Sequence, residues 1–140
     1  MESADNRMPR LITLPKINDP RGNLTFIESS VGIPFDVMRN YWIYDVPSGK
    51  WRDGHAFKEQ QEFIIALSGS FDVVINDGEK EQKFHLSHPQ IGLYVPEMMW
   101  RCINNFSTNS VALVLSSTAY DPNDYIEDYN DYKMQKQQKR

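Results

Sequence analysis

Residues 49–69 read GKWRDGHAFKEQQEFIIALSG, and this stretch says more about the fold than any other part of the chain. Residues 62–67 form a short, mainly apolar run that ends at Ser68-Gly69, a pair that tolerates the positive φ of a hairpin turn. His55 stands six residues after Gly49 and seven before Glu62. We therefore expect a β-strand with a tight turn, and one imidazole and one carboxylate close to it.

Similar short apolar runs recur with a period of two along the rest of the chain, broken by Gly, Pro, Asn and Asp. This pattern is typical of strands joined by turns, and Asn76-Asp77-Gly78 predicts a second hairpin. We expect nine strands, at 11–17, 23–28, 35–45, 62–67, 70–75, 82–86, 92–95, 101–106 and 111–116. So many short strands predict an all-β sandwich or barrel.

The pattern changes after residue 120, where the alternation stops. Asp121-Pro122 is a suitable helix start, because proline is favoured at the first helical position. Tyr125, Ile126 and Tyr129 would then share one side of a short helix. We expect this helix to close the domain.

The length of 140 residues fits a single domain. We expect a flexible N-terminus at 1–10, the β domain at 11–132, and a flexible basic tail at 133–140 that frays in water. No internal repeat is visible.

Composition excludes several classes of protein. The net charge of −4 and the pI near 5.3 argue against binding to nucleic acid or to an anionic membrane. Cys102 is the single cysteine, which excludes an intramolecular disulfide and suits a reducing cytoplasm. The first ten residues lack the apolar core of a signal peptide, and no run of about 18 apolar residues follows. We expect a cytoplasmic protein.

Gly49, His55, Glu62 and Gly69 resemble the first motif of the cupins, Gly-x5-His-x-His-x4-Glu-x6-Gly, whose two histidines and glutamate bind metal inside a jelly-roll barrel. The spacing agrees, but Phe57 stands in place of the second histidine. The resemblance implies an all-β cupin jelly-roll or β-barrel.

Pro96, Arg101 and Asn105 resemble the second cupin motif, with Arg101 in place of its histidine. A divalent ion needs about three lone-pair donors, and neither phenylalanine nor a guanidinium supplies one. Two of the four ligands are therefore missing, and we expect a barrel without metal or other cofactor.

Longer stretches resemble the sugar-nucleotide 3,4-ketoisomerases, the WxcM-like branch of the cupins, over about residues 11–132. The matching residues are Arg21-Gly22-Asn23-Leu24, Glu28, Pro34-Phe35, 39–44, Gly54-His55-Ala56, Ser68-Gly69, Asp77-Gly78, 92–96, Met99-Trp100 and Asp124-Tyr125-Ile126. The resemblance implies a homodimer that binds a dTDP-linked 4-keto-6-deoxyhexose and moves its carbonyl from C4 to C3 without a cofactor.

The resemblance also implies which residues act. His55 matches the base that removes the proton at C3, and Tyr41 matches a tyrosine that binds the sugar or relays a proton. Arg39 shares a strand face with Tyr41, so both side chains would face the ligand. Independently of the resemblance, Arg21, Arg39, Arg52, Lys58 and Arg101 form a cationic set that suits a diphosphate and an enolate oxygen. For Arg52 and Lys58, a place on the solvated surface is the alternative.

Glu62 has two interpretations: it hydrogen-bonds His55 and tunes its basicity, or it forms a structural salt bridge. Phe57 leaves the function open as well, because the family usually carries His-Ala-His where this chain reads His55-Ala56-Phe57. An active isomerase, an epimerase-like variant with altered C4 stereochemistry and a sugar-nucleotide binder without catalysis all remain. A metal-dependent cupin such as a dioxygenase is a further, weaker alternative.

Overall fold

The computed structural model describes residues 8–28, 32–47, 49–50 and 52–139, without the side chains of residues 52 and 53. Most of the predicted flexible N-terminus, residues 1–7, lies outside this range. The first sheet has the strand order β1 (Arg10–Thr13), β9 (Ile91–Val95), β6 (Glu62–Ser68), β11 (Val111–Ser116) and β4 (Arg39–Tyr44). The second has the order β12 (Tyr125–Ile126), β5 (Arg52–Phe57), β10 (Trp100–Asn104), β7 (Phe71–Asn76) and β8 (Glu81–Leu86).

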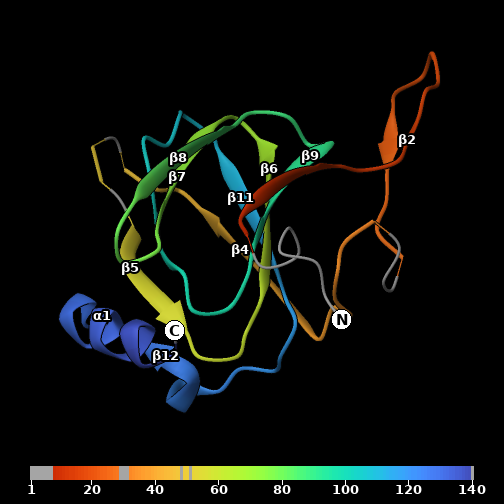
Figure 1. The fold of residues 1–140 in the computed structure, drawn as a ribbon. Coiled ribbons are helices and arrows are strands. Elements are labelled where there is room, and N and C mark those ends of the chain that lie inside the picture. The colour runs from red at the N-terminus through yellow and green to blue at the C-terminus, as the bar shows by residue number, and fades with distance from the viewer. Residues whose placement is uncertain (1–7, 29–31, 48, 51, 140) are drawn as a thin grey trace.

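The two sheets curve around a common interior and form a barrel, as Figure 1 shows, with neighbouring strands antiparallel. A third, two-stranded sheet of β2 (Lys16–Ile17) and β3 (Leu24–Thr25) projects from the barrel; we call this hairpin the arm. Helix α1 (Tyr129–Gln138) lies outside the barrel, near β5 and β12. The expected all-β cupin-type barrel with a short C-terminal helix is therefore confirmed.

The main hydrophobic core lies between the sheets and comes from alternate residues of their strands. Ile64 and Ala66 of β6 meet Phe71, Val73 and Ile75 of β7 there, all nearly or fully buried. Burying each large apolar side chain contributes about 1.5–3 kcal/mol, so this layer supplies much of the drive to fold. Strand β6 is also buried on its outer face, which explains why its sequence is a continuous apolar run.

The predicted hairpin turns are confirmed. Gly69 connects β6 to β7 with φ +66, and a Cβ there would lie 2.9 Å from the Cα of Ser110. Between β7 and β8, Gly78 has φ +99 and donates its N–H to the side chain of Asn76. Both turns need the left-handed backbone that glycine adopts without strain.

Strands β5 and β12 are both absent from the nine predicted strands, and β5 is the longer of the two. Its sequence contains Asp53 and Gly54, which are poor strand formers by themselves. The neighbouring strand decides the outcome, because a Cβ at Gly54 would lie 2.7 Å from Cε2 of Trp100 on β10. Glycine lets the indole ring pack directly on the β5 backbone, and tertiary packing overrides local propensity.

The helix prediction was wrong in its position. Asp121 caps only a short 3₁₀ turn, Pro122–Asp124, and the next two residues pair with β5 as β12. Helix α1 begins after Asp128, whose carboxylate accepts a hydrogen bond from the backbone N–H of Asp131. The frayed tail expected from residue 133 is instead helical through Gln138, and Lys136 Nζ donates to the carbonyl of Met98 at 2.9 Å.

The helix covers the outer face of the second sheet. Tyr132 is buried there with Ala56, Met98 and Ile126. Its hydroxyl lies 3.0 Å from the carbonyl oxygens of Asn76 and Met98, and both can accept its hydrogen bond. The domain boundary expected at residue 132 therefore falls inside an anchored helix. Within the described part of the chain, no helix has the length and apolar character needed to cross a membrane.

Candidate active site

His55 lies on the inner face of β5. The backbone register places His55 directly opposite Arg101 of β10, so the two side chains are neighbours on the same face. Phe57, two residues along, shares that face, whereas Ala56 faces α1. The Nε2 atom of His55 is buried, which places an imidazole nitrogen inside the barrel rather than in bulk water.

Beside His55 lies a network of three side chains from three strands, namely Tyr41 of β4, Glu62 of β6 and Arg101 of β10. Arg101 donates from Nε to Glu62 Oε1 at 2.8 Å and from Nη2 to Oε2 at 3.1 Å. The Tyr41 hydroxyl donates to Glu62 Oε2 at 2.8 Å and accepts from Arg101 Nη2 at 2.8 Å. Arg101 and Glu62 are only 2% and 1% exposed, so this is a fully buried ion pair.

The electrostatics follow from this pairing. Burial opposes ionisation of Glu62, but Arg101, the Tyr41 hydrogen bond and the nearby His55 together hold its pKa below the usual value. Burial raises the pKa of Tyr41; Arg101 opposes the rise, and Glu62 and Tyr125 add to it. The Glu62 carboxylate therefore stays ionised beside a neutral phenol.

Of the two interpretations of Glu62, the structure supports the salt bridge. Both carboxylate oxygens accept hydrogen bonds from Arg101, and the resulting pair is the centre of the network. His55 also acts electrostatically on Glu62, so the salt bridge and an effect of Glu62 on His55 do not exclude each other.

Gln60 extends the network and was not predicted. Its Nε2 donates to Glu62 Oε2 and to Ser116 Oγ, both at 3.2 Å, and its Oε1 accepts from Thr118 Oγ1 at 2.8 Å. Gln60 is 2% exposed. A buried amide in the loop between two motif strands carries no distinctive sequence signal, because polar loop residues are usually exposed.

Aromatic rings enclose the other side of His55. The Phe57 ring meets His55 edge-on with a centroid distance of 4.9 Å, and Tyr125 of β12 lies 5.3 Å from the same imidazole. Phe57 and Tyr125 contact each other at 4.6 Å. We call His55, Phe57 and Tyr125 the aromatic cluster.

The predicted cationic set is only partly brought together. Arg39 lies beside the network, with its guanidinium 5.1 Å from the Tyr41 ring centroid and 5.3 Å from that of Tyr120. Its buried Nε has no hydrogen-bond partner among the described residues, so a donor remains available to a ligand. Lys58 is exposed in the loop after β5, and the side chain of Arg52 lies outside the described part.

Arg21 is far from the position expected of a substrate-binding residue in its own barrel. It lies in the turn of the arm, with a side chain that is 90% exposed and a salt bridge of 2.9 Å to Asp19. Arg21 therefore does not line the site around His55 in the same chain.

The residues present do not fit a metal ion. Glu62, the carboxylate that survives from the motif, has both oxygens occupied by Arg101, and Phe57 provides no lone pair. Over the described ranges, no three His, Cys, Asp or Glu side chains lie close enough to share an ion.

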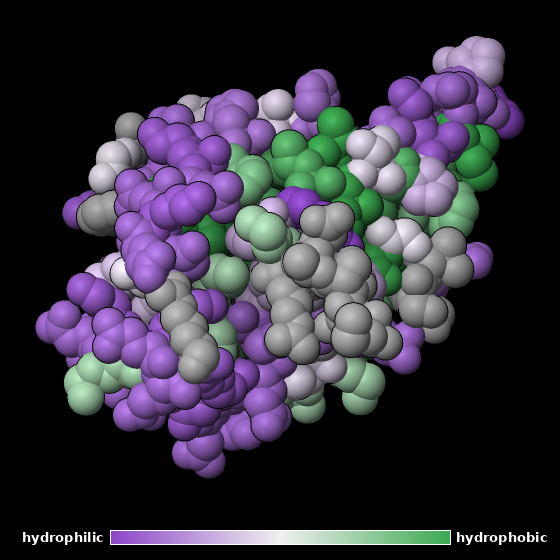
Figure 2. Space-filling model, in the orientation of Figure 1, coloured by the Kyte–Doolittle hydropathy of each residue, from purple (hydrophilic) through white to green (hydrophobic). Residues whose placement is uncertain are grey.

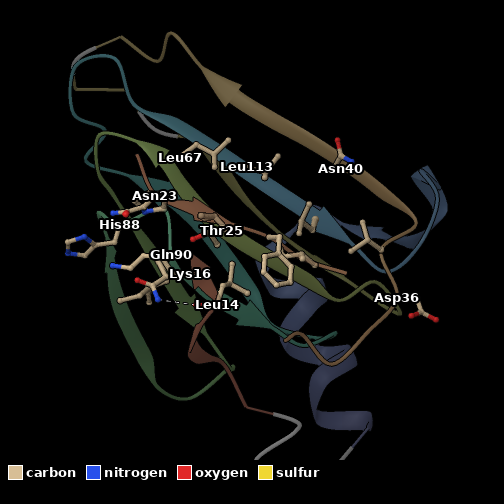
Figure 3. Close-up of a pocket in the computed structure, with 17 residues that line it drawn as sticks. Leu14, Lys16, Asn23, Thr25, Asp36, Asn40, Leu67, His88, Gln90 and Leu113 are labelled. Atoms are coloured by element: carbon tan, nitrogen blue, oxygen red, sulfur yellow. Dashed lines mark hydrogen bonds between the residues drawn. The ribbon is translucent and has the colours of Figure 1, made fainter. Parts of the chain in front are cut away.

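A groove of about 980 Å³ lies elsewhere, between the outer face of the first sheet and the arm, as Figure 3 shows. Ile65, Leu67 and Leu113 form part of its floor, and Thr25 lines it from the arm. None of the predicted site residues lines this groove. It is therefore distinct from the site around His55.

Comparisons with known proteins agree with this geometry. Residues 7–137 match the family model FdtA, described as WxcM-like, C-terminal. The chain is 38% identical over 124 residues to the TDP-4-oxo-6-deoxy-α-D-glucose-3,4-oxoisomerase of Aneurinibacillus thermoaerophilus, covering 89% of each protein.

Two solved structures extend the comparison. The TDP-quinovose 3,4-ketoisomerase of Campylobacter jejuni superposes with a TM-score of 0.86 at 37% identity, covering 90% of this chain and 97% of that one. A histidine-to-asparagine variant of a 3,4-ketoisomerase from Thermoanaerobacterium thermosaccharolyticum, in complex with TDP-4-keto-6-deoxyglucose, gives a TM-score of 0.90 at 34% identity, covering 93% and 94%.

Proposed function

The chain belongs to the FdtA family of WxcM-like C-terminal domains, and we propose that it is an isomerase that moves the keto group of a dTDP-4-keto-6-deoxyhexose between C4 and C3. The observation that carries this proposal is the half-buried His55, whose Nε2 atom is buried and which has aromatic rings on one side and an ion pair on the other. A histidine in such a place suits proton transfer at neutral pH.

In the proposed reaction, His55 removes the proton at C3 and an enediolate forms across C3 and C4. A proton then returns at C4, and the carbonyl is left at C3. Each step moves only protons and electron pairs within one sugar, so no oxidant and no cofactor is needed. A positioned base contributes about 10²–10⁴ to such a rate.

We propose that Arg101 and Glu62 hold the structure of the site and do not contact the diphosphate directly. The positive charge of Arg101 is compensated by Glu62, which supports this assignment. Arg39 is the better candidate for a phosphate or sugar oxygen, because it is half-buried beside Tyr41 and its Nε is not satisfied within the described chain. Arg52, the first residue of β5, and Lys58, in the loop after it, stay as candidates for contact with the diphosphate.

Proton NMR in deuterated buffer tests the proposal. Purified protein with dTDP-4-keto-6-deoxyglucose should give a 3-keto sugar and incorporate deuterium, and a His55→Asn variant should do neither. Shifted ligand resonances without exchange would contradict isomerisation and favour the non-catalytic binder that Phe57 leaves open. A product with the opposite C4 configuration would identify the epimerase-like variant.

We also propose that the protein is a homodimer, and that the groove and the arm are its contact surface. Figure 2 shows hydrophobic surface between the barrel and the arm. Leu67 in the groove is 48% exposed, and Ile17 and Leu24, which pair in the arm, are 55% and 54% exposed. A two-stranded hairpin is marginally stable alone in water, so this arm needs a covering surface. A second copy offers a matching apolar groove.

We further propose that the enzyme works in the cytoplasm. Cys102, the single cysteine, is a free thiol, which suits a reducing compartment.

A further inference from the structure

Ketone transfer between neighbouring carbons requires a proton donor in addition to a base. When the C3–H bond breaks, negative charge develops on the C4 oxygen, and the product forms only after the C3 oxygen loses its proton. A hydroxyl that gives a proton to one oxygen and takes one from the other would serve both needs. Two tyrosines near His55, Tyr41 and Tyr125, carry such a hydroxyl.

The hydroxyl proton of Tyr41 already forms a hydrogen bond to Glu62. A phenol has one proton to donate, and that of Tyr41 points to Glu62 Oε2 at 2.8 Å. Arg101 in turn donates to the Tyr41 oxygen at 2.8 Å. Tyr41 could protonate a sugar only by leaving the buried carboxylate one hydrogen bond short, which is unfavourable. The role in proton relay that the sequence suggested for Tyr41 therefore conflicts with its contacts.

Tyr125 has the geometry that Tyr41 lacks. It stands opposite Phe57 in the pairing of β12 with β5, and its ring lies 5.3 Å from the His55 ring. Its side chain lies on the inner face, because the next residue, Ile126, is buried on the outer face under α1. The Tyr125 hydroxyl makes no hydrogen bond within the described part of the chain, so its proton is not committed to that part.

The backbone on either side of Tyr125 is tightly held. The Asp124 carboxylate accepts hydrogen bonds from the backbone N–H groups of Glu59 and Gln60, at 2.9 and 3.1 Å. The Asp124 carbonyl accepts from the N–H of Lys58 at 3.0 Å. These bonds fix β12 to the loop that connects the strand of His55 to the strand of Glu62. The position of the Tyr125 ring is therefore set by the same loop as the base.

We propose that Tyr125 is a catalytic residue of the ketoisomerase reaction, an inference that rests on the function proposed above. His55 takes the C3 proton, and the C3–H electrons form the C3–C4 double bond as the C4 carbonyl electrons move to oxygen. Tyr125 gives its proton to the C4 oxygen and recovers one from the C3 oxygen as the new carbonyl forms. The electrons of the C3–C4 double bond then form the new C4–H bond with a proton that the protonated His55 supplies. Phe57, in the place of the motif's second histidine, packs on the Tyr125 ring and orients it.

The test is a Tyr125→Phe variant, which keeps the ring and removes only the hydroxyl. We expect kcat to fall by about 10²–10⁴-fold with little change in KM, as for loss of a positioned acid or base. Thermal unfolding and affinity for TDP should match the wild type, which separates a catalytic role from a structural one. A Tyr129→Phe variant is the matched control, because its hydroxyl donates to Asn76 under α1, outside the barrel.

The outcomes distinguish the two proposals. If the wild type neither converts substrate nor exchanges its C3 hydrogen, the proposed function fails. If the wild type is active and Tyr125→Phe keeps its kcat, or raises only KM, the role of Tyr125 is overturned. Should the variant melt at a lower temperature, assays below that temperature still decide, since the folded fraction is then known.

Discussion

Arg101 donates two hydrogen bonds to Glu62 inside the barrel, where the two residues are only 2% and 1% exposed. Neither charge would be tolerated there alone, because desolvation of a single ion costs several kcal/mol. Each of the two charges therefore needs the other. The Tyr41 hydroxyl and the Gln60 amide donate further hydrogen bonds to the Glu62 carboxylate. The stability of the barrel therefore depends on satisfying the hydrogen bonds of this buried pair as well as on burying apolar side chains.

Removing one partner should therefore be severe. We expect Arg101→Met to lower the free energy of unfolding by about 3–5 kcal/mol, because Glu62 is left charged and buried. The double variant Glu62→Met with Arg101→Met should recover a substantial part of that loss. Urea denaturation measures both. Arg21→Met is the control, since the Arg21 side chain is 90% exposed and loss of its surface salt bridge should leave the unfolding midpoint unchanged. Equal midpoints for Arg101→Met and wild type would contradict the assignment.

The same pair makes stability depend on pH. The folded-state pKa of Glu62 lies below its reference value of 4.5, so its stabilising contribution is present above that value and is lost as pH falls through the folded pKa. Asp72, whose pKa is lowered from 3.8 by hydrogen bonds to His85 and Asn105 against the effect of burial, adds in the same direction. Thermal melts should show falling stability below about pH 4.5, with a smaller slope in Glu62→Gln. An unchanged slope in that variant would contradict the role of Glu62.

At the scale of elements, β12 has only two residues, yet it holds Tyr125 beside His55. Its position depends on the Asp124 carboxylate, which accepts two backbone N–H groups from the loop after β5. Main-chain pairing over two residues supplies too few hydrogen bonds to hold a strand by itself, so the side chain of Asp124 is what keeps the strand in register.

Asp124→Ala should therefore affect activity more than stability. We expect a loss of about 1–3 kcal/mol, since two backbone donors lose their acceptor, together with a lower kcat as Tyr125 and His55 move apart. Asp121→Ala is the control, because that carboxylate accepts from Asn123 in an exposed turn. Steady-state kinetics at a temperature where both variants are folded decide the matter. A wild-type kcat in Asp124→Ala would show that the hydrogen bonds to the Asp124 carboxylate are not needed to position Tyr125.

Which elements the sequence could predict depends on where their signal lies. Strand β6 can be predicted from its continuous apolar run and β7 from its apolar alternation, and each is followed by a turn that contains glycine. Strand β5 cannot be predicted in this way, because Gly54 is explained only by the Trp100 ring that packs on it. Helix α1 was misplaced for a related reason: Asp121-Pro122 and Asp128 are both suitable caps, and only pairing with β5 assigns Tyr125 to a strand.

Some residues of the candidate site could be predicted from the sequence, and others could not. His55, Glu62 and Arg101 were predicted from the cupin motifs, and Tyr41 from the resemblance to the ketoisomerases. The four residues come together in the barrel. The exchange of hydrogen bonds among them was not predictable, because it depends on which of several nearby donors reaches Glu62. Gln60 and Tyr125 reach the site through a loop and a two-residue strand, which have no periodicity to reveal them.

At the scale of the whole molecule, the apolar groove and the arm lie on the side of the barrel formed by the first sheet. We expect sedimentation equilibrium to give about twice the chain mass of 16.3 kDa. Leu67→Asp, which places a charge in the groove, should shift the protein to monomer. Met134→Asp is the matched control, because Met134 is 62% exposed on α1, away from the groove. A wild-type monomer at micromolar concentration would overturn the dimer.

Strand β6, buried on both faces and bonded to β9 and β11 on either edge, has a further consequence. Its backbone amides can meet solvent deuterium only when the barrel opens as a whole, so we expect residues 63–66 to exchange slowest of all. The same uncharged Phe-Ile-Ile-Ala-Leu segment, once released, would pair readily with copies of itself. Heating would then end in aggregation rather than in a reversible transition, and the shelf life of the protein would be governed by how fast it unfolds.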